Sequence, residues 1–187
     1  MSRKENLINN LKHYADWLEI LEEIEDEKWI TPIAEGKWSV SEIVSHIMFW
    51  DQHILSEISK QIKEITFPDF DLKNKVAAEY AKSGVTKSQL LKEAKSAREE
   101  LITAMNKMSE EKLEQPIFMN GESHCPRTGM PYSLFFIMEE HSEHDTYHQK
   151  QIIPNPIFPL LKPLGELFIN SILYEEIIYL SAGRLGK

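Results

Sequence analysis

Hydrophobic residues recur at alternating spacings of three and four along most of the chain, which is the period of amphipathic helices. The first stripe of apolar residues on one helix face follows Ser2 and Glu5. These two residues have the spacing of a capping box, in which each side chain bonds a free backbone amide near the other. This pattern predicts a helix over residues 3–26. Its apolar positions are Leu7, Leu11, Tyr14, Leu18 and Leu21.

A second capping box, Ser39 and Glu42, begins a helix predicted over residues 40–64, before Pro68. Its stripe is Ile43, Ile47, Trp50, Ile54 and Ile58. The following segment, DLKNKVAAEYAKSG, predicts a short connecting helix closed by Gly84.

Thr86 and Gln89 suggest a third capping box, at the start of a helix predicted over residues 87–108. Residues 114–132 contain two Gly and three Pro and show no period, so we expect a loop with a short hairpin. A fourth long helix is predicted over residues 133–153. Four amphipathic helices that share one core indicate an all-α helix bundle.

Four prolines interrupt the chain between residues 154 and 163, and Leu164 to Ala182 has apolar spacing typical of one more helix. We therefore divide the chain into a bundle, residues 1–153, and a Pro-rich linker with a helical extension, residues 154–187. We expect the extension to pack on the bundle or on a dimer partner.

The charge and cysteine content bear on which partners and which compartment the protein is expected to have. The 21 basic and 30 acidic residues give a net charge of −9, which opposes binding to nucleic acid or to an anionic membrane. Charged residues and prolines interrupt the most apolar stretch, residues 157–180, so no membrane span is expected. The single cysteine, Cys125, and the lack of a signal-peptide pattern favour the cytoplasm.

Candidate chemistry lies in the histidines. His144 and His148 are one helical turn apart, and His148 lies within about 20° of Ile137 on the helical wheel, so both rings should face the core. His46 borders the stripe of the second helix and should also point inward. These three residues can share one metal ion, and three protein ligands with an open position are typical of a catalytic site. The alternative is that they are core histidines of a bundle that binds no metal.

Two segments resemble motifs of the DinB/YfiT-like superfamily. GKWSVSEIVSHIMFWDQH resembles its first motif, and EEHSEHDTYHQKQI resembles its second motif. FDLKNKVAAEYAKSGVTKSQLLKEAKSARE resembles the middle of its thiol-dependent members. The resemblance assigns the family's metal ligands to His46, His144 and His148. Many members carry two adjacent histidines at the end of the second motif, where this chain has Tyr147 before His148.

The resemblance implies a four-helix bundle in up-down-down-up order with a divalent zinc or nickel ion, in a protein that acts on a small molecule and forms a homodimer. Characterised relatives include bacillithiol S-transferases and mycothiol-dependent isomerases, and many others are described as metal-dependent hydrolases. A low-molecular-weight thiol is therefore a candidate cosubstrate. The alternative is a stress-response protein that binds a metal or small molecule without catalysis.

Further residues are candidates for the edge of the site, and none is identified as catalytic. Trp50, His53 and His141 share faces with the expected ligands and could line a pocket. Glu143 and Asp145 flank His144 but lie off its face on the wheel, so we expect them in solvent. The sequence His124-Cys125 offers a less favoured nucleophile in the predicted loop.

Overall fold

The computed structural model describes residues 1–60 and 62–152 and confirms the predicted all-α four-helix bundle. The proposed extension, residues 154–187, lies outside the described residues. The helices are α1 (Arg3–Ile20), α2 (Asp26–Ile30), α3 (Val40–Ser59), α4 (Phe70–Ala81), α5 (Lys87–Asn106), α6 (Glu110–Glu114) and α7 (Leu134–Ile152), with a 3-10 turn at Leu21–Glu23 and strands β1 (Glu64–Ile65) and β2 (Phe118–Met119).

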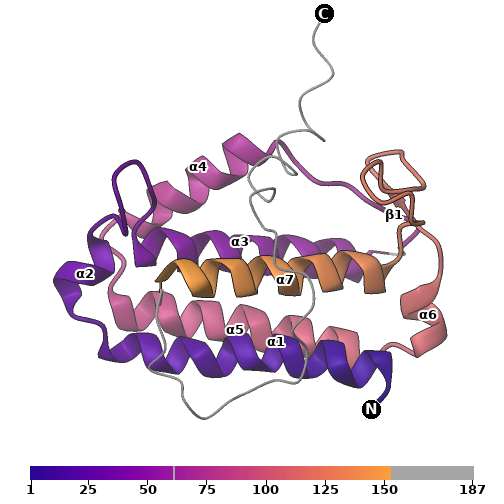
Figure 1. The fold of residues 1–187 in the computed structure, drawn as a ribbon, viewed down its shortest axis with the longest axis horizontal. Helices are drawn as coiled ribbons and strands as arrows, with labels where there is room; N and C mark the ends of the chain where they lie inside the picture. Colours follow the sequence, from indigo (N-terminus) through magenta and orange to yellow (C-terminus); the bar gives the residue numbers. More distant parts are fainter. Residues whose placement is uncertain (61, 153–187) are drawn as a thin grey trace, which may run out of the picture.

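The long helices α1, α3, α5 and α7 form the bundle (Figure 1). α1 and α7 run in one direction, and α3 and α5 run in the other, which is the expected up-down-down-up order. α3 packs against α5, α5 against α1, and α1 against α7. α3 also contacts α7, so helices distant in sequence become neighbours.

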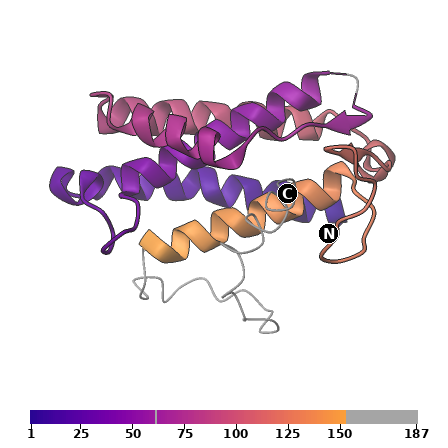
Figure 2. The ribbon, with the colours of Figure 1, turned by 90° about the horizontal axis from the view of Figure 1, so that it is seen from above.

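Helix α4 makes the parallel arrangement of α3 and α5 possible. It returns the chain along the outside of α3 to the end where α3 began (Figures 1 and 2). The Ser45 hydroxyl donates to the Ala77 carbonyl at 2.7 Å and ties the two helices together. The turn after α4 passes through Gly84 at φ 94°, a left-handed conformation that favours glycine.

The observed caps match the sequence at two of the three predicted boxes. Ser2–Glu5 and Ser39–Glu42 both form reciprocal capping boxes. Thr86 accepts from the Gln89 amide, but the Gln89 side chain bonds Glu93 instead of returning to Thr86.

Two helix ends were predicted too far along the chain. The first helix ends at Ile20, and the acidic run that follows forms a 3-10 turn and α2. α2 buries Trp29, so this acidic run also contributes a side chain to the core. α3 ends at Ser59 rather than near residue 64, because the chain turns there into β1.

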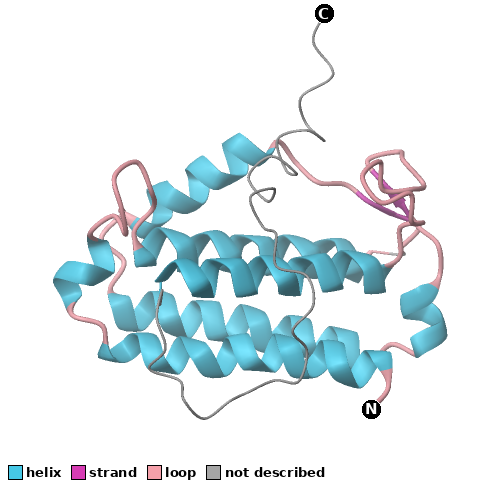
Figure 3. Cartoon of the chain, in the orientation of Figure 1, coloured by secondary structure: helices cyan, strands magenta, loops and turns pink. Residues whose placement is uncertain are grey.

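The loop between α5 and α7 holds α6 and the small strand β2 (Figure 3). β2 pairs with β1 in parallel, which joins the loop to the segment after α3. Met119 and Glu122 exchange both backbone hydrogen bonds across Asn120 and Gly121, so the loop also contains the expected short hairpin. A further antiparallel bridge joins His124 to Pro131.

The core consists of two apolar clusters along the bundle axis. One contains Leu11, Ile54, Leu101 and Met138, and the other contains Leu18, Ile47, Leu90 and similar residues of α1, α3 and α5. The buried polar residues of α3, α5 and α7 include His46, Asp51, Arg98, His141, Asp145 and His148. Within residues 1–60 and 62–152, no helix has the length and apolar content that a membrane crossing requires.

Candidate metal centre

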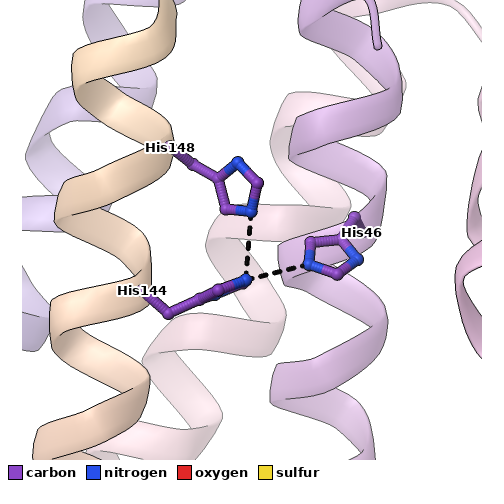
Figure 4. Close-up of side chains that lie close together, drawn as sticks. All are labelled: His46, His144 and His148. Atoms are coloured by element: carbon purple, nitrogen blue, oxygen red, sulfur yellow. Dashed lines mark hydrogen bonds between the residues drawn. The ribbon is translucent and has the colours of Figure 1, made fainter. Parts of the chain in front are cut away.

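Three histidine rings from two helices converge near the end of the bundle where α3 begins and α7 ends (Figure 4). His46 projects from the second turn of α3, and His144 and His148 project from successive turns of α7. His46 Nε2 lies 3.1 Å from His144 Nε2, and His148 Nε2 lies 3.0 Å from the same atom. The structure therefore brings together the three residues that the sequence singled out.

The spacing of these nitrogens suits a shared ion. Nitrogens bound to zinc at 2.0–2.1 Å would lie about 2.9 Å apart for a 90° angle and about 3.4 Å apart for a tetrahedral angle. The observed 3.0 and 3.1 Å fall between these values. Potential ligand atoms of the three residues all lie within 4.8 Å of one another.

Hydrogen bonding alone does not satisfy this arrangement. A neutral imidazole nitrogen offers either one N–H or one lone pair. His144 Nε2 faces two other Nε2 atoms, so only one of its two contacts can be a hydrogen bond. A cation that accepts all three lone pairs would satisfy both contacts, so the donor set fits a metal ion.

The surroundings favour the neutral, metal-binding form of two of these rings, those of His46 and His144. Burial lowers the pKa of His46 well below its ordinary value, and the charge of His148 lowers it further. Burial, together with His148 and His46, has the same effect on the pKa of His144. His144 keeps part of its surface exposed, but its Nδ1 is buried.

The remaining ring nitrogens differ in their partners. His148 Nδ1 lies 2.8 Å from Gln151 Oε1, an acceptor that places the proton on Nδ1 and leaves the Nε2 lone pair facing the cluster. His46 Nδ1 and His144 Nδ1 are buried without a closed hydrogen bond.

Tryptophans enclose the cluster on the α3 side. Trp38, which precedes the helix, lies 4.8 Å from the His46 ring and 6.4 Å from the nearly parallel His148 ring, measured between centroids. Trp50 approaches His46 edge-on, with 6.3 Å between the ring centroids. His53 contacts Trp50 but bonds the Thr66 carbonyl through Nε2, so it does not join the cluster.

Next to the histidines lies a buried ionic network that the sequence analysis missed. Arg98 of α5 is fully buried and binds both carboxylate oxygens of Asp51, at 2.7 and 2.9 Å. Its Nη1 lies 2.5 Å from Asp145 Oδ2, and its guanidinium lies 4.2 Å from the centre of the Tyr14 ring. Burial would lower the pKa of Arg98, but Asp145 and Asp51 more than offset this and raise it.

His141 belongs to this network rather than to the ligand cluster. Its Nε2 lies 2.7 Å from Asp51 Oδ1, and its ring is stacked 6.2 Å from that of His144. His141 thus lies between the ionic network and the ring of His144.

The expected exposure of Asp145 was wrong. Asp145 is 3% exposed, whereas Glu143 is exposed as predicted. Asp145 is buried because α7 turns a wider arc of its surface toward the interior than its apolar residues indicate. Arg98 compensates the charge of the buried carboxylate. A signal was present in the sequence: Asp51 and Arg98 occupy inward positions in the series Ile47–Asp51–Ile54 and Ala94–Arg98–Leu101.

His141, His144 and Asp145 form a second group with ligand atoms within 4.8 Å of one another. We assign no ion to it, because the Arg98 guanidinium already binds Asp145 and would repel a cation.

Cys125 lies at the opposite end of the bundle, packed in the cluster of Leu11 and Leu101. Burial would raise the pKa of its thiol, but hydrogen bonds from Thr128, Arg127 and Tyr132 lower it. His124 bonds the neighbouring Ser123 hydroxyl rather than the thiol. The described residues therefore show no Cys–His pair at this position.

Comparisons with known proteins agree with this architecture. A family model described as the DinB superfamily matches residues 11–152. Among solved structures, the chain is similar to YfiT from Bacillus subtilis, with a TM-score of 0.65 and 16% identity over 82% of this chain and 87% of that chain. YfiT is described as a probable metal-dependent hydrolase with an unusual four-helix bundle topology. A search of curated proteins gave no match.

Proposed function

The chain belongs to the DinB superfamily, and from this premise we propose that it is a metal-dependent enzyme that acts on a small molecule. We propose that His46, His144 and His148 hold one divalent ion through their Nε2 atoms. Three protein donors are typical of catalytic zinc sites, whereas structural sites use four. An ion held in this way would supply a Lewis acid at neutral pH.

One observation carries the proposal: the position of His144 Nε2 between two other Nε2 atoms, at 3.1 and 3.0 Å. Three neutral imidazoles gain little from this approach in the absence of a shared cation. Burial of the rings supports the same role, because it keeps the lone pairs free of protons.

The neighbouring ionic network positions the helices that carry the ligands. Arg98 of α5 binds Asp51 of α3 and Asp145 of α7, so one buried side chain holds the three helices together behind the histidines. His141 adds a contact to Asp51 at 2.7 Å.

We consider two reaction classes for this site, hydrolysis and transfer to a thiol. The description of YfiT favours hydrolysis, and the resemblance of residues 70–99 to thiol-dependent relatives favours transfer to a low-molecular-weight thiol. We propose zinc or nickel as the ion, because both bind imidazole well. Trp38 and Trp50 provide an apolar surface beside the site for either kind of substrate.

Metal analysis tests the site itself. We expect purified protein to bind about one zinc or nickel ion per chain, and the double variant His144→Ala/His148→Ala to bind almost none. The control is His13→Ala, because this histidine is exposed and contacts the Asn9 carbonyl of its own helix. Equal metal content in the wild type and the double variant would overturn the proposal.

Activity measurements then separate the classes. The metal-loaded protein is incubated with ester and amide substrates, and with an electrophile such as monochlorobimane together with cysteine, glutathione or bacillithiol. Hydrolysis or thiol conjugation that is lost in His46→Ala identifies the reaction. A metal-loaded protein inactive throughout would favour the alternative, a metal-binding protein without catalysis.

We further propose a homodimer that works in the cytoplasm. The family resemblance supports the dimer, and a lone cysteine without a disulfide partner supports a reducing compartment. Light scattering during gel filtration measures the first, and fractionation of the source cells measures the second.

A further inference from the structure

A residue of α4 faces the back of the candidate ligand His46. α4 packs along α3, and the bond from Ser45 to Ala77 fixes the two helices next to His46. Asn74 lies three residues before Ala77, so both occupy the same face of α4. Asn74 is therefore directed at the part of α3 that carries the site.

Two buried polar atoms at this contact lack a closed hydrogen bond. They are Nδ1 of His46 and Oδ1 of Asn74. The Asn74 side chain nevertheless interacts with the His46 ring as a hydrogen-bonding neighbour. Buried polar groups rarely remain unsatisfied, so two complementary groups in contact are expected to be partners.

We infer that Asn74 is a positioning residue, whose Oδ1 accepts the Nδ1 proton of His46 and thereby directs the Nε2 lone pair at His144 and His148. The inference rests on the proposed metal site, and it adds a residue from a third helix to it. Metal-binding histidines usually donate their second N–H to an acceptor, which fixes the tautomer and the ring orientation.

His148 provides a parallel within the same cluster. Its Nδ1 contacts Oε1 of Gln151, which is also a carboxamide, at 2.8 Å. Two of the three candidate ligands would thus be oriented in the same way, one from within α7 and one from α4. α4 thereby takes part in the site, although it lies outside the four-helix bundle.

Metal affinity tests the inference through Asn74→Leu, which keeps the approximate volume and removes the acceptor. We expect its affinity for Co²⁺, measured by chelator competition, to fall about 10- to 100-fold. Asn74→Asp should retain affinity within a few-fold, because the carboxylate also accepts the proton. The control is Lys75→Ala, an exposed neighbour on α4, which should leave the affinity unchanged.

Long-range ¹H–¹⁵N NMR of the metal-free wild type supplies a readout that needs neither a variant nor an ion. We expect His46 to carry its proton on Nδ1 and a bare Nε2. A proton on Nε2, or a folded Asn74→Leu variant with unchanged Co²⁺ affinity, would overturn the inference. A wild type that has the expected tautomer but binds no metal would overturn the proposed function and leave the contact of Asn74 with His46 supported.

Discussion

The guanidinium of Arg98 on α5 binds the carboxylate of Asp51 on α3 through two hydrogen bonds, in a position that is closed to solvent. The paired geometry is the strong form of an arginine–carboxylate contact. Because Arg98 also binds Asp145, one side chain joins three helices of the bundle.

Removal of Arg98 should therefore be costly. Arg98→Met would leave two buried carboxylates without their cation, and we expect the free energy of unfolding to fall by about 3–5 kcal/mol. Urea denaturation measures the change. The matched control is Arg127→Met, which removes an exposed arginine that binds Glu140 and should cost at most about 1 kcal/mol. Similar losses in both variants would contradict a structural role for the buried network.

Metal should stabilise the folded protein. At a free metal concentration about 100 times the dissociation constant, binding to the folded state alone adds about 2.7 kcal/mol. For a chain of this size, this corresponds to a rise in Tm of roughly 5–11 °C. Differential scanning calorimetry with zinc and then with excess chelator measures the rise and its reversal. His46→Ala should show neither, and a similar rise in that variant would indicate that zinc binds elsewhere.

The metal-free protein should lose stability in weak acid. Burial, followed by neighbouring histidines, holds the pKa of His46 and of His144 below the value of about 6.5 found in unfolded chains. The unfolded state therefore binds more protons than the folded state below pH 6.5. The two neutral rings contribute to the free energy of unfolding above pH 6.5, and this contribution is lost as the pH falls toward their pKa values in the folded state.

Each such group contributes a slope that approaches about 1.4 kcal/mol per pH unit. Urea unfolding at pH 7.5, 6.5 and 5.5 should thus give a steeper loss for the wild type than for His46→Gln/His144→Gln. His13→Gln, which changes an exposed ring, should behave like the wild type. The same slope in all three proteins would mean that the buried rings are protonated in the folded state.

The two reciprocal capping boxes should differ in importance. Ser39 is buried where α3 begins, and its hydroxyl contacts Ser41 as well as the Glu42 amide, whereas Ser2 is exposed. Loss of a cap costs about 0.5–2 kcal/mol, so Ser39→Ala should lie at the upper end of this range and Ser2→Ala at the lower end. Chemical denaturation checks the order, and a larger loss for Ser2→Ala would contradict it.

The sequence contained enough information for the bundle and for the convergence of the three histidines. Spacings of three and four fixed the inward faces, and His46, His144 and His148 all lie on those faces. Local patterns are sufficient here, because helical geometry alone determines which residues share a face.

Contacts between helices were harder to predict. Asp145 was expected in solvent, because the pattern of α7 contains no information about a cation on α5. The pairing of β1 with β2 joins two segments that are far apart in the sequence. The local spacing of apolar residues contains no information about such a contact. The inferred contact of Asn74 with His46 was hard to predict for the same reason, because it depends on the path by which α4 returns along α3.

The positions of the candidate ligands in the chain have a mechanical consequence. His46 and His144 are 98 residues apart in sequence, yet their rings touch. An ion between them would act as a reversible crosslink that closes a loop of nearly a hundred residues, so it would restrict the unfolded chain more than a crosslink between close neighbours. Under tension applied at the two termini, force would pass through that bond, and most of α3, all of α4 and α5, and part of α7 would be shielded until it broke.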